Sequence, residues 1–189
     1  MELASVQSSK LKAYLFSLER GNIMPGTLYQ NPTLFNESVS AVTLSNTVAL
    51  GAIQWLGGNQ YNYVYMDSST PSSGQPGYAV NLLSGGSGYT VTMSMALGDY
   101  AYGVIQNATM ATSYYGWVLV NGHNAMVQTP ANTGVVGGCP LGVTASGTFG
   151  NLFTLASGGT AGAPVFCVGR ALTTGATGTS VLANVSFLN

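Results

Sequence analysis

Charge is what this sequence lacks most. Asp, Glu, Lys and Arg together make up 5% of its 189 residues, whereas a soluble domain usually carries about 25%. With four basic residues, five acidic ones and a formal net charge of −1, the chain has no basic stripe that would attract the phosphates of a nucleic acid. A polybasic patch for anionic lipids is excluded for the same reason. We therefore expect neither a nucleic-acid partner nor a membrane partner.

A long apolar run and a secretory signal are also missing. The longest apolar stretch, TVALGAIQWLGG at residues 47–58, is too short and too rich in glycine to cross a bilayer. The amino terminus has Glu2 first and its lysines only later, which is not the charged-then-apolar order of a signal peptide. The sequence therefore predicts synthesis in a cytoplasm without export.

Cysteine is nearly absent. Cys139 lies in GGCPLG and Cys167 in PVFCVG, and two cysteines make no disulfide framework and match no metal-ligand spacing. We expect two free thiols, one of them a small core residue, although a disulfide would need only a proximity that the sequence does not reveal. No metal and no cofactor are expected.

Groups that could carry catalysis are few. After residue 37 the chain holds two Asp, one His, one Arg and two Cys. A Ser-His-Asp triad would have to use His123 with Asp67 or Asp99, but no serine lies in a G-x-S-x-G elbow, and a pair of His123 with a cysteine is only formally possible. A glycosidase needs two facing carboxylates, and Asp67 and Asp99 are the only such pair after residue 37. Both are expected to lie in turns instead. We expect no enzyme and no catalytic residue.

Phosphate-binding loops are missing as well. The glycine-rich segments at residues 84–88 and 156–162 are not followed by a lysine and a helix, as a nucleotide-binding loop would be. Arg170 stands alone in the otherwise apolar stretch FCVGRALTTG. We expect this side chain to be paired with an Asp or a carbonyl, or to lie at an interface.

Charge is concentrated at the start of the chain, which divides the sequence into two regions. Within residues 1–37, the stretch SKLKAYLFSLER has apolar residues at helical spacing and is followed by two prolines, which predicts a short amphipathic helix or an extended arm. Residues 38–189, which hold three of the nine charged residues, form the second region. The charged residues of the first region are Glu2, Lys10, Lys12, Glu19, Arg20 and Glu37.

From residue 38 onward the apolar period is two. QYNYVYM places Tyr61, Tyr63 and Tyr65 on one face, and YTVTMSM at residues 89–95 alternates in the same way, so both predict strands with one wetter side. Similar short runs bounded by Gly, Ser, Asn or Pro continue to the end of the chain. The sequence predicts an all-β fold, a small β-barrel or β-sandwich-like domain of short antiparallel strands, at residues 38–189.

A hairpin is predicted in YYGWVLVNGHNAM, residues 114–126. Two strand-like runs flank Asn121-Gly122, a pair that tolerates the positive φ values of a type I′ turn. His123 follows the turn and is expected to face solvent. Trp117 is expected to pack on a core face or an interface.

The motifs of residues 59–189 come in a characteristic order. YGWV, NG, GGTAGAP, GRAL and a closing hydrophobic strand together resemble the small β-barrel proteins that decorate the heads of tailed phages. The resemblance implies a capsid decoration, or cement, protein that binds where capsid subunits meet and stabilises the expanded shell from the outer surface of the virion. The implied partners are the major capsid protein and further copies of the chain, in a homotrimer or a dimer.

Two contact surfaces are expected on this basis. The first is an anchoring arm, with apolar residues among Pro and Gly that could lie on a capsid subunit: Met24, Leu28, Tyr29, Leu34 and Phe35. The second is an oligomer interface rich in aromatic residues: Tyr61, Tyr63, Tyr65, Tyr114 and Trp117. The alternative for the second set is that the rings close the domain's own barrel.

Two other functions remain open from the sequence. A phage fibre, tail or host-surface binding module would expose Tyr114, Tyr115 and Trp117 to a sugar. An enzyme would use His123 with Asp67 or Asp99. In each case we expect weak pH dependence of folding between about pH 5 and 8, because few groups can change charge there.

Overall fold

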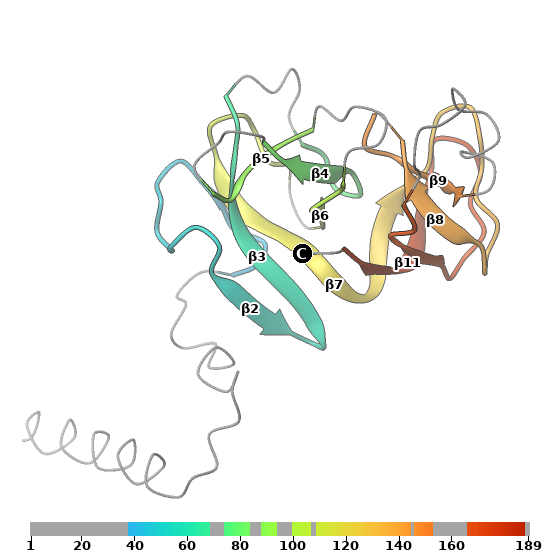
Figure 1. The fold of residues 1–189 in the computed structure, drawn as a ribbon, viewed down its shortest axis with the longest axis horizontal. Coiled ribbons are helices and arrows are strands. Elements are labelled where there is room, and N and C mark those ends of the chain that lie inside the picture. The colour runs from blue at the N-terminus through green and yellow to red at the C-terminus, as the bar shows by residue number, and fades with distance from the viewer. Residues whose placement is uncertain are drawn as a thin grey trace, which may run out of the picture. The chain divides into compact units, whose positions relative to one another are not determined.

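The computed structural model describes residues 38–68, 74–83, 88–93, 100–106, 109–144, 146–152 and 166–187. The strands of these residues all belong to one mixed, eleven-stranded sheet, and residues 37–189 form one compact unit (Figure 1). The predicted all-β class is confirmed. The expected arm at residues 1–37 lies outside the described residues.

Most strands are short, as expected. Their order along the chain is β1 (Val42–Thr43), β2 (Ile53–Leu56), β3 (Asn59–Met66), β4 (Ala79–Leu82), β5 (Thr90–Thr92), β6 (Gly103–Ile105), β7 (Tyr115–Gln128), β8 (Pro140–Val143), β9 (Phe149–Asn151), β10 (Gly169–Ala171) and β11 (Ser180–Ser186). The long strand β7, with 14 residues, is the exception. The strand pairings are antiparallel except for β3 with β5, which is parallel.

Five strands close into a ring of pairings, which we call the ring. β3 pairs with β5 and with the first half of β7, β4 pairs with β5 and β6, and β6 pairs with β7. Closure leaves these five strands without an unpaired edge. The apolar side chains inside the ring include Val64, Met66, Val80, Ile105 and Val118.

Four of the other strands, β8 to β11, extend from the second half of β7, and we call this part the wing. Outside it, β1 pairs with the first half of β7 and β2 pairs with β3. β7 pairs with β11, β11 with β10, β10 with β8, and β8 with β9. Figure 1 shows β7 (yellow) leaving the ring, bending, and continuing beside β11 and the orange strands. Along β11, Val181, Ala183 and Val185 are buried while the residues between them are exposed. The wing therefore has one buried face and one face open to solvent.

A second hydrophobic cluster joins the ring to the wing. It contains Tyr63, Trp117 and Leu119 from the ring strands and Phe149 and Phe187 from the C-terminal part of the chain. The strands β3 and β7 supply alternate residues to this cluster and to the ring interior, so both of their faces are buried. This explains why the prediction of a wetter side is wrong for β3.

The prediction of a wetter side is also wrong for β5, the strand predicted within residues 89–95. Thr90 and Thr92 of β5, which were expected to form its wetter side, are as buried as Val91 between them. Val91 belongs to the cluster inside the ring, so Thr90 and Thr92 lie on the outer face of β5, and their burial shows that other parts of the domain cover this face. The alternation of Thr and apolar residues in the sequence does not reveal this.

The hairpin predicted at Asn121-Gly122 is wrong. β7 continues through both residues because its two halves have different partners: the first half pairs with β3 and the second with β11. The strand bends there instead of folding back. Gly122 leaves room at the bend for the Asn59 side chain: a Cβ atom would lie 2.5 Å from Oδ1 of Asn59, and this oxygen accepts a hydrogen bond of 2.8 Å from the backbone N–H of His123.

A two-residue hairpin turn lies elsewhere, between β2 and β3. Leu56 pairs with Asn59 across the turn, and the two residues between them, Gly57 and Gly58, have φ values of 59° and 83°. Positive φ at both central positions is the requirement of a type I′ turn. The Gly-Gly pair was therefore the better hairpin signal in this sequence.

Gln106 binds the backbone of β7 just beyond the bend. Its side-chain amide donates from Nε2 to the carbonyl of Met126 at 2.9 Å and accepts at Oε1 from the N–H of Met126, also at 2.9 Å. A single side chain thus satisfies both backbone groups of one residue, as a neighbouring strand would. Gln106 directly follows β6, so this pair of bonds ties the ring to the wing.

Candidate functional site

The aromatic residues predicted for an oligomer interface lie mostly inside the domain. Tyr63 is 0% exposed, Trp117 3% and Tyr61 7%, and the rings of Tyr63 and Trp117 are 5.1 Å apart. The hydroxyl of Tyr63 lies within hydrogen-bond distance of Thr47 Oγ1, at 3.3 Å. These rings pack within one chain, which is the alternative that the sequence left open. At 3% exposure Trp117 has no free face on which a sugar could stack.

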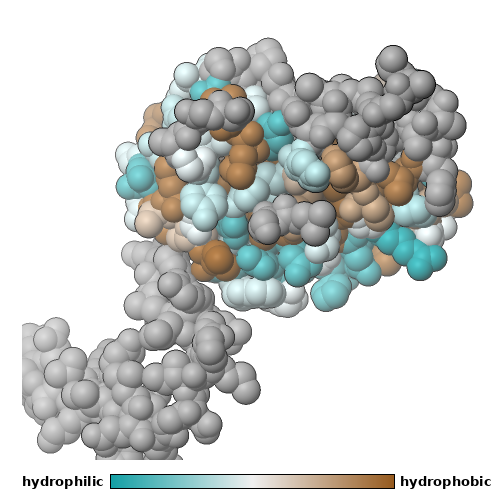
Figure 2. All heavy atoms as spheres, viewed as in Figure 1, coloured by the Kyte–Doolittle hydropathy of each residue, from teal (hydrophilic) through white to brown (hydrophobic). Residues whose placement is uncertain are grey.

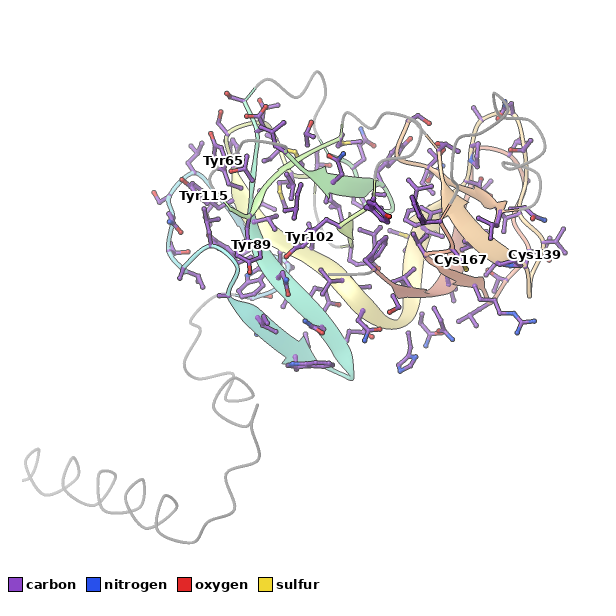
Figure 3. All side chains as sticks on the ribbon, viewed as in Figure 1. Tyr65, Tyr89, Tyr102, Tyr115, Cys139 and Cys167 are labelled. Atoms are coloured by element: carbon purple, nitrogen blue, oxygen red, sulfur yellow. The ribbon has the colours of Figure 1, made fainter. Side chains whose placement is uncertain are left out.

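Tyr65 and Tyr114 are half-buried, so their predicted role in an oligomer interface stays a prediction. Figure 3 shows Tyr65 beside Tyr115, and the two ring centroids are 4.9 Å apart. Tyr115 is also half-buried. The pair lies at the end of β3 where Tyr65 is the register partner of Tyr115.

One tyrosine is buried with a polar partner inside the ring. The amide of Asn62 donates from Nδ2 to the hydroxyl of Tyr102 at 2.5 Å. Burial raises the pKa of Tyr102, the hydrogen bond from Asn62 acts in the opposite direction, and the nearby Tyr89 phenol raises it again. Figure 3 shows Tyr89 and Tyr102 near one another, with ring centroids 6.2 Å apart. A phenol that holds its proton more tightly than usual is a structural group at neutral pH.

His123 and Asp67, one of the pairs that an enzyme would use, are not brought together. His123 is exposed, as predicted, and its N–H bonds to Asn59 at the first residue of β3. Asp67 directly follows the last residue of β3, where its N–H donates to the carbonyl of Val91 at 2.8 Å. Eight residues of extended strand separate these ends by about 26 Å. Asp99 lies outside the described residues, so a role with His123 stays a prediction.

Both cysteines are free thiols in the wing, as expected, and Figure 3 shows them there. The expectation that one is a core residue is wrong, because Cys139 is half-buried and Cys167 is exposed. The amide of Asn151 donates to Sγ of Cys139 at 3.4 Å. Among the described residues, no group of three or more His, Cys, Asp or Glu side chains could hold a metal ion.

An open, shallow groove of about 560 Å³ lies on the wing at the bend of β7. It brings together three residues that the sequence singled out separately: His123, Cys167 and Arg170. Nε of Arg170 donates to the carbonyl of Gly138 at 2.6 Å, which confirms the predicted pairing with a carbonyl. The other lining residues are Asn121, Gly122, Gly138, Pro140, Gly169, Asn184, Val185 and Ser186.

Strand register explains why these residues meet. Arg170 of β10 is paired with Asn184 of β11. On the other side of β11, Val185 pairs with Gly122 and Ala183 with Ala125, so His123 and Asn124 both lie opposite Asn184 in a β-bulge. The bulge has Asn124 at a φ of 52°, a conformation that asparagine tolerates better than most residues. Arg170, Asn184 and His123 thus lie side by side across three strands.

The sequence analysis missed Asn184 and its neighbour Leu182. The signal was present in SVLANVS, where the buried positions of β11 are Val181, Ala183 and Val185. This alternation places Leu182 on the polar face with Asn184, where it is 41% exposed. An apolar residue out of phase with its own strand is a cue that can be read without a structure.

Comparisons with known proteins identify a similar solved structure but no family. No family model matches the chain, and no curated protein is similar to it. Among solved structures, the N base of the head fiber gp8.5 of bacteriophage phi29 is similar with a TM-score of 0.46 and 12% sequence identity, covering 68% of this chain and 97% of that chain. No argument on fold or function is based on a likeness at this level. No helix of the described residues is long and apolar enough to cross a membrane.

Proposed function

We propose that the chain is a structural virion protein that binds the outer surface of a tailed-phage capsid and stabilises the expanded shell by bridging capsid subunits. The observation that carries the proposal is the location of the motifs behind the resemblance. YGWV lies in β7, GRAL begins in β10, and the closing hydrophobic strand is β11. These strands are direct neighbours in the order β7, β11, β10. GGTAGAP, residues 158–164, lies outside the described residues.

The surface chemistry of the domain supports a role in contact. Apolar and polar side chains alternate over the face shown in Figure 2, and the exposed large apolar residues are spread over several strands and loops. A surface of this kind supplies apolar contact area and uncharged hydrogen-bonding groups, and protein interfaces contain both. The proposed partners are therefore the major capsid protein and, in a homotrimer, other copies of this chain.

Binding to shells of known expansion state tests the proposal. Purified protein is added to expanded and unexpanded capsids prepared without it, and bound protein is measured by co-sedimentation. We expect saturable binding to expanded shells, and a higher temperature of shell disruption for decorated than for bare shells. Binding to tail fibres or to host envelopes, with none to capsids, would replace this proposal by the fibre or receptor-binding alternative.

The amino-terminal arm is a separate part of the proposal. Its apolar residues Met24, Leu28, Tyr29, Leu34 and Phe35 are proposed to anchor the domain on a capsid subunit. Removal of residues 1–36 is expected to abolish capsid binding and to leave the β domain folded, since residues 37–189 form a compact unit. Circular dichroism checks the fold and co-sedimentation checks the binding. Full binding by the truncated protein would refute the anchoring role.

A further inference from the structure

The open face of the wing carries exposed side chains that the fold does not use. We define the wing face as His123, Arg170, Leu172, Leu182 and Asn184. Leu182 and Asn184 are two residues apart on β11 and share its exposed side. Arg170 is the register partner of Asn184, and the N–H of Leu172 donates to the carbonyl of Leu182 at 2.7 Å. Two leucines therefore lie directly beside an Arg-Asn-His row.

The leucines supply apolar area. Leu172 is 43% exposed and Leu182 is 41% exposed. A single exposed leucine is ordinary on a protein surface. Two that are adjacent, with an arginine and an asparagine at their border, have the composition of a small apolar centre with a polar rim.

Arg170 supplies a directed charge. Its Nε donates to the carbonyl of Gly138 at 2.6 Å, which restrains the guanidinium and leaves its two terminal nitrogens for another acceptor. Two parallel N–H donors match the two oxygens of a carboxylate. Because the side chain is already positioned, a partner that binds it loses less conformational freedom than with a mobile arginine.

The charges of the domain indicate what kind of partner fits. The wing face holds an arginine and a histidine, and none of the described residues lining the adjacent groove is Asp or Glu. Asp67 lies at the far end of β3 from His123. A second copy that docked through the same face would bring two Arg170 side chains together, which is unfavourable. A partner with its own carboxylate is therefore favoured over two-fold self-association through this face.

The groove also distinguishes a protein from a sugar. None of its described lining residues is Tyr, Trp or Phe, so it offers no aromatic ring on which a sugar could stack. We propose that the wing face docks on a protein that presents an Asp or Glu side chain next to an apolar residue. The inference rests on the proposed function, under which that protein belongs to the capsid shell.

Charge and apolar variants of the full chain test the inference. Arg170→Glu and Leu182→Asp each place a negative charge on the wing face, and Leu56→Asp is the matched control, since Leu56 is 50% exposed on β2 of the other part of the domain. Binding to expanded capsids is measured by co-sedimentation. We expect each wing variant to weaken binding at least about tenfold, as at an interface hot spot, and Leu56→Asp to change it less than about twofold.

Salt dependence provides a second readout with a milder variant. Arg170→Gln removes the charge and keeps a side-chain donor for the carbonyl of Gly138. Wild-type binding should weaken as salt rises, because the Arg-carboxylate contact is screened, and Arg170→Gln should show a smaller salt dependence. Near-ultraviolet circular dichroism of each variant shows whether the packing around Trp117 is intact.

The possible outcomes separate the two proposals. If the wild-type protein binds capsids and the folded wing variants bind as tightly, the inference is overturned and the proposed function stands. If the wild-type protein does not bind capsids, the proposed function is overturned, and the inference with it. If the wing variants bind capsids normally but lose self-association in light scattering, the wing face is instead an interface between copies.

Discussion

The ring and the wing use the same long strand in different ways. In the ring, the first half of β7 pairs on both sides and buries both of its faces, with Trp117 in one cluster and Val118 in the other. In the wing, the second half of β7 pairs with β11, whose side chains alternate between buried and exposed. The side chains of these ring strands are therefore buried in the two hydrophobic clusters and stabilise the fold. The open sheet of the wing leaves one face available for a partner.

The fold also brings two of the chain's few basic side chains to one surface. Arg170 and His123 come from positions 47 residues apart in the sequence, yet the bend and the bulge of β7 bring them to one surface. The ring has no such set of exposed polar groups in its described strands. Under the proposed function, stability and contact therefore lie in different parts of one sheet.

The largest effect is expected from a cavity in the ring. Ile105→Ala removes a side chain that is 1% exposed inside the ring, and such truncations cost about 2 to 5 kcal/mol. Leu182→Ala on the wing face should cost less than about 0.5 kcal/mol. Urea unfolding of both variants measures the difference. Equal losses would contradict the division into a structural ring and a contact wing.

A smaller effect is expected at the bend where the two parts meet. Gly122→Ala places a Cβ atom 2.5 Å from Oδ1 of Asn59, so the Asn59 side chain must move and lose its hydrogen bond to the N–H of His123, which costs about 1 kcal/mol. The same substitution in an Asn59→Ala background should cost clearly less, because the clashing atom is gone. A double-mutant cycle by urea unfolding tests this coupling. Additive costs would show that Asn59 is not the reason for the glycine.

Tyr102→Phe tests the polar pair inside the ring. Loss of the hydroxyl removes the acceptor of Asn62 Nδ2 and should cost about 1 kcal/mol at pH 8. Since burial raises the pKa of Tyr102, the folded state holds the phenol proton more tightly than the unfolded state does. The contribution of the protonated Tyr102 phenol to the free energy of unfolding is complete below about pH 10 and is lost as the pH rises through the higher pKa of the folded state.

The same variant should therefore unfold with a flatter pH dependence above about pH 10. Urea unfolding of wild type and Tyr102→Phe between about pH 8 and 11 measures both slopes. Tyr102 would have no raised pKa in the folded protein if the two alkaline slopes were identical.

The smallest effect is expected on the wing face itself. His123→Ala should change the free energy of unfolding by less than about 0.5 kcal/mol, because His123 is exposed and its bond to Asn59 comes from the backbone. Stability of the wild type should also be nearly level between about pH 5 and 8, where histidine titrates. A steep slope in this range that disappears in His123→Ala would contradict the account.

The sequence predicted the all-β class, the free thiols, the exposed His123 and the carbonyl partner of Arg170 from local chemistry alone. It failed where long-range pairing decides. Asn121-Gly122 has hairpin chemistry, but β3 and β11 each pair with one half of β7 and keep it extended. Thr90 and Thr92 look like a wet face but are buried on the outer side of the ring, where other parts of the domain cover them. The tyrosines of β3 looked available for a partner because the second cluster that covers them comes from distant segments.

The groove on the wing could not be predicted for a related reason. Its members come from β7, β10, β11 and the residues around them, and only the register of the sheet places Arg170, Asn184 and His123 in one row. A one-residue shift of β11 would turn Asn184 to the buried face. Side-chain alternation along one strand is visible in a sequence, whereas the register between strands is not.

The central claim is that this chain is a structural component of a phage capsid. Its copy number relative to the major capsid protein, measured by quantitative mass spectrometry of purified virions, tests this most directly. The account predicts a ratio near that of the capsid protein itself. A few copies per particle would contradict it in favour of a fibre or tail module, and complete absence from the virion would refute a structural role.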